Sequence, residues 1–311
     1  MTQITKQQSD TFWRLKALAI FTVFFAHMPY TGTNQIMIYL FNLIGMVGVP
    51  TFLILSGYFD YYSQSSLYKS AKRLFIPLFI WGLLTYITSH MNTAQDFYDS
   101  TIGFLKWIYG CGSWLYFVPV LFLCKLICCI DNRYYQSILC IISLISISWT
   151  SFGIIPYNEF FTPYTNPLNF LIYFQIGRYL RRKGIDLDNN LYLFTSLIIA
   201  VVSLFLWATD APSYFSIYAV FVSVCSFFFL YRPAHIINFG EETGKMSYVI
   251  YLFHLVPASI LNRRLLMTFG PRIDFVKVPL VFAILVGIVW CIKLILYKLN
   301  CQKLLQFLGY R

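Results

Sequence analysis

Charged residues are scarce in this sequence. Asp, Glu, Lys and Arg make up 11% of its 311 residues, while hydrophobic residues make up 59%. A typical globular chain has roughly 25% charged residues, so this composition excludes an ordinary soluble domain. The apolar residues form long continuous runs rather than alternating segments of about ten residues, which predicts transmembrane helices and not a closed barrel.

Several other features are missing. Residues 1–10 are polar and no small-residue cleavage site follows the first apolar run, so we expect that run to be a retained span. The eight cysteines lie mostly within apolar runs and show no metal-ligand spacing with histidine, so neither disulfides nor a metal site is expected. Because no repeat, low-complexity tract or appended soluble domain is evident, residues 1–311 are predicted to form a single transmembrane domain.

Ten apolar runs approach the length of about 17–25 residues that spans a bilayer as a helix. They cover residues 12–30, 36–59, 71–89, 114–130, 137–155, 167–180, 191–207, 214–231, 246–261 and 276–299. The predicted fold class is therefore all-α, a polytopic transmembrane bundle of about ten spans.

The basic residues lie in short clusters between these runs, and this placement predicts the orientation. With the N-terminus inside, most of the 23 lysines and arginines fall on the inner side, as the positive-inside rule expects. The outer side keeps only Lys106, Arg263, Arg264, Arg272 and Lys277. Both termini are therefore predicted to be cytoplasmic. The net charge of +11 encodes topology, and no nucleic-acid partner is expected.

Ionisable residues inside spans are functional candidates, and the first run contains two. Lys16 lies near its inner end and His27 near its outer end, just before Met28-Pro29. Eleven residues separate them, a rise of about 16 Å that returns to nearly the same helix face. A histidine accepts a proton near neutral pH, which suits a general base. The alternative is that His27 is an interfacial polar group and Lys16 extends to the inner headgroups.

The following segments add further candidates. Ser56 lies in the segment "GVPTFLILSGYF", whose small residues allow the backbones of neighbouring helices to approach closely. "YKSAKRLFIPLF" carries Lys69, Lys72 and Arg73, a cluster suited to phosphate, or to topology and anionic lipid.

These segments, in order, resemble the acyltransferase 3 family of integral membrane acyltransferases. Lys16 and His27 match its first-span pattern of a basic residue, ten residues and a histidine. Four later segments also resemble motifs of this family. They are "PTFLILSGYF", the basic cluster, "GSWLYFVPVLF" with Trp114, and "GKMSYVIYLFHLV" with Ser247, Tyr251 and His254. The chain departs from the pattern at Trp13, where relatives usually carry Asp, and in having lysines at usual arginine positions.

The resemblance implies an O-acyltransferase of the bacterial cytoplasmic (inner) membrane, in contact with membrane lipids. Its donor would be acyl-CoA, most often acetyl-CoA, used as a co-substrate with no permanently bound cofactor. Its acceptor would be a hydroxyl of a cell-surface carbohydrate, including lipid-linked forms. Catalysis would rest on His27 and Lys16, and donor binding on Lys69, Lys72 and Arg73.

Roles for the remaining residues are open. Ser56, Trp114, Ser247 and Tyr251 are candidates for the substrate path or its support, and His254 for either that path or packing. Glu159, on an outer loop, is a candidate to orient His27. His27 would act as a direct general base or carry a transient acyl group. A transporter or flippase for a sugar-lipid or small anion is the alternative from another class, and a non-catalytic scaffold is a second.

Overall fold

The computed structural model describes residues 5–28, 34–60, 64–90, 97–111, 114–130, 132–209, 214–254, 260–261 and 274–310. Helices account for 80% of the structure, and this part of the chain contains no strand. The all-α prediction is therefore confirmed. The principal helices are α1 (Lys6–Ala26), α2 (Gln35–Met46), α3 (Gly48–Tyr58), α4 (Gln64–His90), α5 (Phe97–Tyr109), α6 (Phe117–Ile127), α7 (Arg133–Ser151), α8 (Leu171–Lys183), α9 (Asn190–Thr209), α10 (Ile217–Ile236), α11 (Glu241–Lys245), α12 (Ser247–Phe253), α14 (Asp274–Lys298) and α15 (Gln302–Phe307).

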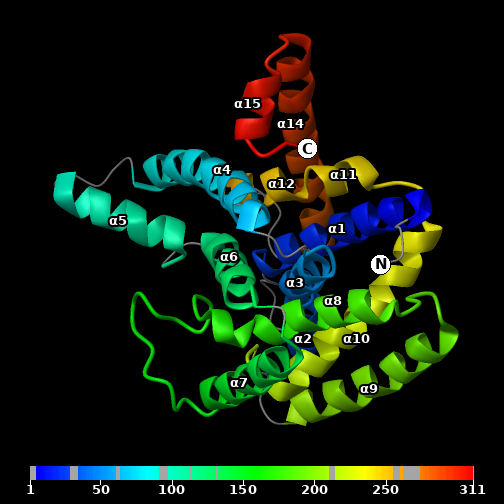
Figure 1. Cartoon of the computed structure of the whole chain (residues 1–311). Helices are drawn as coiled ribbons and strands as arrows, with labels where there is room; N and C mark the ends of the chain where they lie inside the picture. The colour runs from blue at the N-terminus through cyan, green and yellow to red at the C-terminus, as the bar shows by residue number, and fades with distance from the viewer. Residues whose placement is uncertain are drawn as a thin grey trace.

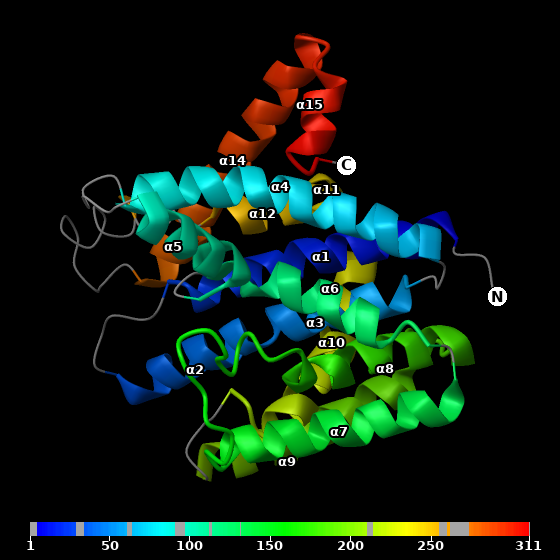
Figure 2. The same ribbon diagram turned by 60° about the vertical axis from the view of Figure 1, so that its left-hand side comes forward.

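The helices lie in successive layers around α1 and α3 (Figure 2). Helices α4 and α12 lie on one side of α1, and α8, α10, α7 and α9 lie beyond α3. The helical pair α14 and α15 projects from the bundle on the α4 side (Figure 1). The short 3₁₀ turns Trp114–Tyr116 and Pro167–Asn169 lead into α6 and α8.

Helix α1 is the central element, and its ends follow from local sequence. Thr5 caps its first turn in a reciprocal capping box with Gln8, which satisfies backbone N–H groups that would otherwise lack partners. It ends at Ala26 with His27 as the C-cap, and Pro29 two residues later disfavours helical conformation at Met28. One face of α1, including Leu15, Ala19 and Val23, is buried.

Glycines set the closest helix contacts. A Cβ added to Gly57 of α3 would lie 2.0 Å from the carbonyl oxygen of Phe174, and one added to Gly177 of α8 would lie 1.9 Å from that of Ile54. These reciprocal contacts leave room only for hydrogen, so small residues let the α3 and α8 backbones approach.

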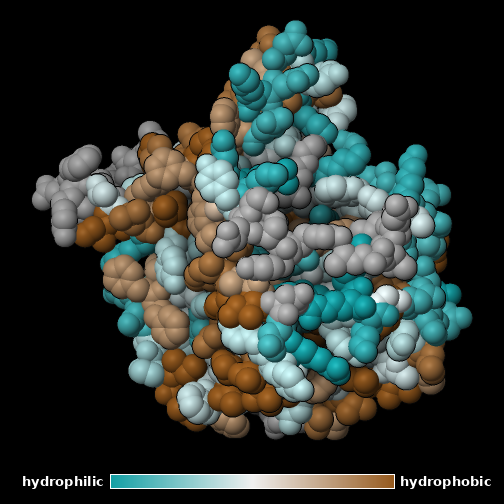
Figure 3. All heavy atoms as spheres, in the orientation of Figure 1, coloured by the Kyte–Doolittle hydropathy of each residue, from teal (hydrophilic) through white to brown (hydrophobic). Residues whose placement is uncertain are grey.

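Helix α11 links both ends of the chain through its acidic residues. Glu241 accepts hydrogen bonds from Arg14 at 2.5 and 3.0 Å. Glu242 accepts from Lys245 at 2.6 Å and from Lys293 of α14 at 2.8 Å. The polar residues on the right of Figure 3 mark this end of the molecule, around α11 and the start of α1.

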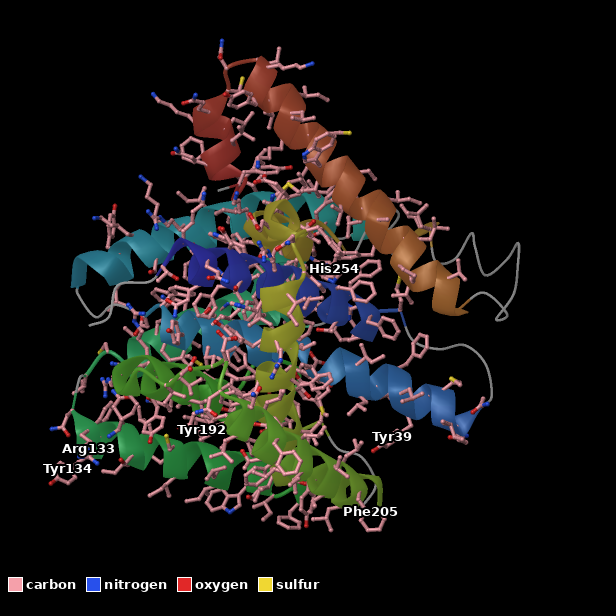
Figure 4. All side chains as sticks on the ribbon, turned by 90° about the vertical axis from the view of Figure 1, so that its right-hand side faces the viewer. Tyr39, Arg133, Tyr134, Tyr192, Phe205 and His254 are labelled. Carbon is pink, nitrogen blue, oxygen red and sulfur yellow. The ribbon has the colours of Figure 1, made fainter. Side chains whose placement is uncertain are left out.

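Much of the outer surface is apolar. Brown residues gather over α7 and α9 and over α4 and α5 in Figure 3. Tyr134 and Phe205, labelled in Figure 4, are 81% and 69% exposed and point away from the bundle. Exposed apolar surface on this scale fits a multi-pass membrane protein.

Fewer helices meet the length and apolarity of a span than the sequence predicts. Four qualify among the described residues, Gln35–Tyr58, Leu67–Thr88, Ile217–Ile236 and Val276–Lys298, and the bent pair Thr101–Tyr109 and Trp114–Ile127 adds a fifth. Helix α1 carries Asp10, Arg14 and Lys16 in its first half. The count of ten and the cytoplasmic termini therefore stay predictions.

The predicted ninth span, 246–261, is interrupted. Helix α12 covers only Ser247–Phe253 and begins directly after the separate helix α11. Residues 255–259 of this run lie outside the described residues, as do Arg263, Arg264 and Arg272 of the predicted outer loop.

Candidate functional site

The end of α1 presents His27 to a cavity of about 260 Å³. We call this the histidine cavity. Its wall comes from α1, α2, the turn at Trp114–Tyr116 and two tyrosines from distant segments. The Trp114 ring packs against the His27 ring with centroids 4.4 Å apart. Its polar lining consists of His27, Asn42, Tyr116, Tyr164 and Tyr214.

A second, smaller cavity of about 90 Å³ lies further back along α1. We call it the central cavity. Val23 and Val49 line both it and the histidine cavity. Its polar groups come from Lys16, Ser56, Ser247 and Tyr251, among others.

A third cavity, of about 390 Å³, follows at the Lys16 end of α1. We call it the basic cavity because Lys16, Arg73 and Lys125 line it. It shares Lys16 and Ser56 with the central cavity. The three cavities therefore follow one another along α1, each sharing lining residues with the next, with the basic residues at one end and His27 at the other.

The charged side chains that line these cavities are all basic. Among the described residues, no Asp or Glu lines any of the three cavities. Just outside the lining, Asp60 lies 3.4 Å from the Lys125 ammonium. The Lys16 ammonium lies 4.2 Å from the Trp13 ring centroid, within cation–π range. Such a cavity suits an anionic ligand, because its cations need little rearrangement to meet phosphate.

A hydrogen-bonded group from α12 supports the His27 end. The Tyr251 hydroxyl donates to the backbone carbonyl of Trp114. His254, the C-cap of α12, is 1% exposed and lies with its ring 5.0 Å from that of His27. Figure 4 labels His254 in the interior, beside α1. The motif carried by α12 thus reaches the same site as that of α1, although the two are far apart in sequence.

Several residues proposed from the sequence converge on this series. His27 and Trp114 line the histidine cavity; Lys16, Ser56, Ser247 and Tyr251 line the central cavity; Arg73 lines the basic cavity. Lys16 and His27 line different cavities of this series, Lys16 the central and basic cavities and His27 the histidine cavity.

Three proposed residues lie elsewhere. Lys69, Lys72 and Arg73 are all exposed on α4, and of the three only Arg73 lines the basic cavity. Glu159 lies 3.5 Å from Lys106, with its side chain 87% exposed, and does not line the histidine cavity. The structure therefore does not bring Glu159 to His27.

Sequence reasoning missed other lining residues. Tyr116, Tyr164 and Tyr214 come from three segments and meet at the histidine cavity, with Tyr116 and Tyr164 ring centroids 5.4 Å apart. In a chain with 24 tyrosines no local signal marks these three. Lys125, which the sequence places only among the basic residues of the inner side, lies in the last turn of α6 and lines the basic cavity.

Comparisons with known proteins show the family of the chain. A family model described as an acyltransferase domain, acyltransferase 3, matches residues 14–298, nearly the whole chain. The match includes His254 and the cavity-lining residues from Lys16 onward, whereas Ser9, Phe12 and Trp13, which also line the cavities, precede it. No curated protein and no solved structure matches this chain.

Proposed function

Because the chain belongs to the acyltransferase 3 family, we propose that it transfers an acyl group, most often acetyl, from cytoplasmic acyl-CoA to a hydroxyl of a bacterial cell-surface carbohydrate. The observation that supports this proposal is the row of three neighbouring cavities along α1, with basic residues at one end and a histidine at the other. Such an arrangement suits a long donor with phosphates at one end and a thioester at the other.

The donor would enter at the basic cavity. Arg73 and Lys16 would bind its phosphates, with Lys125 exchanging its contact with Asp60 for phosphate. Charge-assisted hydrogen bonds of this kind are the stronger class. Lys69 and Lys72, exposed on the same helix, would attract the donor at longer range.

The pantetheine arm would then pass through the central cavity beside Ser56, Ser247 and Tyr251. This narrow segment would hold the arm in one conformation and bring the thioester to His27. Binding energy from a remote part of a substrate in this way positions the reacting atoms.

The acceptor hydroxyl would enter the histidine cavity, where aromatic rings offer flat surfaces to a sugar. His27 would take the hydroxyl proton as the oxygen attacks the thioester carbonyl carbon. The carbon–sulfur bond breaks, and the protonated imidazole returns the proton to the departing thiolate, which leaves as free thiol. A transient acyl group on His27 is the variant of this step.

The test is acyl transfer by membranes that contain the chain, with radiolabelled acetyl-CoA as donor and mass spectrometry of surface glycans as the second readout. His27→Ala should lower transfer by about a hundredfold or more, in the range typical of a general base. Full transfer by His27→Ala at equal protein level would exclude both forms of the mechanism. Uptake of a glycan or anion with no donor consumption would instead indicate a carrier.

A further inference from the structure

Two ring nitrogens beside the histidine cavity stand out by their surroundings. His27 Nδ1 and His254 Nε2 are buried, and neither has a hydrogen-bond partner among the described residues. Most buried polar side-chain atoms in proteins have a partner. These two atoms belong to neighbouring rings, with centroids 5.0 Å apart and planes inclined by 31°.

The tautomer of His254 follows from its other nitrogen. His254 Nδ1 lies 2.5 Å from the backbone carbonyl oxygen of Tyr251. A carbonyl oxygen only accepts hydrogen bonds, so Nδ1 carries the proton. A neutral imidazole has one N–H, so Nε2 of His254 carries a lone pair and is an acceptor.

One of the two unpartnered nitrogens is an acceptor, and the other can be a donor. His254 Nε2 needs a donor, and His27 Nδ1 supplies one when it is protonated. We propose that His254 is the positioning residue of His27: when the His27 ring turns toward it, His254 Nε2 accepts a hydrogen bond from His27 Nδ1–H, a bond that the structure does not itself contain, and the lone pair of His27 is left on Nε2. This inference rests on the proposed function, in which that lone pair takes the acceptor proton.

Other candidates for this role are placed less well. Among the described residues no carboxylate lines the histidine cavity, and Glu159 contacts Lys106 instead. The remaining titratable groups of the lining are the hydroxyls of Tyr116, Tyr164 and Tyr214. His254 lies against His27 from the opposite helix and is held by its own backbone contact.

Tyr251 contacts both residues whose rings lie next to His27, namely His254 and Trp114. Its carbonyl fixes the His254 ring, and its hydroxyl fixes the backbone of Trp114. The Trp114 ring in turn packs on His27 at 4.4 Å. The His27 ring is thus confined between a ring that orients it and a ring that limits its rotation, as positioned catalytic groups require.

Two substitutions at His254 separate an orienting role from simple packing. The amide of His254→Gln extends to the former place of Nε2, so its oxygen accepts from His27 Nδ1–H. The shorter His254→Asn reaches only the place of Nδ1. We expect His254→Gln to keep kcat within about threefold of the natural chain. His254→Asn should lower kcat on the order of a hundredfold, as loss of orientation does, with an unchanged KM for acetyl-CoA.

The matched control is His235→Gln. His235 contacts Gln7 and Thr11, away from the cavities, so kcat should not change. Equal kcat for His254→Asn and His254→Gln, with both variants folded in detergent, would overturn the proposal.

A second measurement is independent of acyl transfer. The chain has four histidines, so ¹⁵N labelling of histidine rings gives few signals, and His27→Gln identifies that of His27. We expect His27 to be the Nδ1–H tautomer in the natural chain and in His254→Gln, and to lose this preference in His254→Asn. Absence of the preference in the natural chain overturns the inference. Its presence in a protein that transfers no acyl group overturns the proposed function alone.

Discussion

At the residue scale, neighbouring side chains with the same charge have different surroundings. Lys72 and Arg73 are adjacent in sequence, yet Arg73 lines the basic cavity and Lys72 does not. A local sequence window cannot separate them, because the difference depends on which face of α4 meets α6 and α12.

This difference gives a prediction for donor binding. Arg73→Gln should raise KM for acetyl-CoA about tenfold, because a charge-assisted contact of about 1.4 kcal/mol is lost. Lys72→Gln, the matched control on the same helix turn, should change KM by less than about twofold, because Lys72 lines none of the cavities. Initial-rate kinetics at several donor concentrations measure both values. Equal increases for the two variants would mean that the whole cluster acts through its summed charge.

The spacing of His27 and Lys16 shows what the sequence can predict about the site. Both belong to one continuous helix, so helical periodicity alone predicts that they share a face. The partners of His27 belong to other elements: Trp114 precedes α6, and Tyr251 and His254 end α12. Their meeting depends on tertiary packing, which no spacing rule supplies. Glu159 was chosen by side of the membrane alone and lies near Lys106 instead.

At the element scale, the α3–α8 contact depends on hydrogen at two Cα positions. Gly177→Ala would place a Cβ 1.9 Å from the Ile54 carbonyl oxygen, which is backbone and cannot rotate away. We expect a loss of about 3 kcal/mol or more in stability, because overpacking of this kind forces the helices apart. Thermal unfolding in detergent measures the loss. Gly287→Ala in α14, where a Cβ meets no atom within 4 Å, is the control and should stay within about 1 kcal/mol. Equal melting temperatures for the two variants would contradict the close packing.

The link between α11 and α14 should depend on pH. The hydrogen bond from Lys245, followed by that from Lys293, lowers the pKa of Glu242 below its ordinary value. The unfolded state therefore binds a proton first as pH falls. The contribution of Glu242 to stability is fully present above about pH 4.3, the usual pKa of Glu, and is lost as pH falls through the lowered pKa of the folded state.

We expect Glu242→Gln to flatten the fall in melting temperature between about pH 5 and pH 3, measured by unfolding scans in detergent. Glu159→Gln, at an exposed carboxylate, is the control and should leave the slope as it is in the natural chain. The same slope in Glu242→Gln would show that other carboxylates carry the pH dependence.

At the scale of the whole molecule, the sequence predicts ten membrane spans, but among the described residues only four or five helices are long and apolar enough to be spans by themselves. Helices such as α1 and α8 carry charged residues that lie against other helices: Arg14 bonds Glu241, and Arg178 donates to the Cys128 carbonyl. A helix shielded from lipid by its neighbours needs less apolar length than one that faces lipid. A test of apolarity over a fixed window does not detect spans of this shielded kind, whereas the distribution of basic residues depends on the loops.

The two counts can be separated by the positions of the termini. Ten spans place both ends of the chain in the cytoplasm, as the positive-inside bias predicts, and five spans place them on opposite sides. Four spans also leave both ends on one side, but they put residue 158 on that side as well. A fluorescent protein that folds only in the cytoplasm should therefore be active when fused at either terminus, and an alkaline phosphatase that folds only outside should be inactive at both. Insertion of the phosphatase into the segment around Asn158, in the predicted outer loop after the fifth run, should give the opposite result. Activity of the phosphatase at one terminus and of the fluorescent protein at the other would exclude an even number of spans. Activity of the phosphatase at the N-terminus would place the start of α1 and the basic cavity outside, away from cytoplasmic acyl-CoA, so the topology tests the direction of acyl transfer as well as the fold.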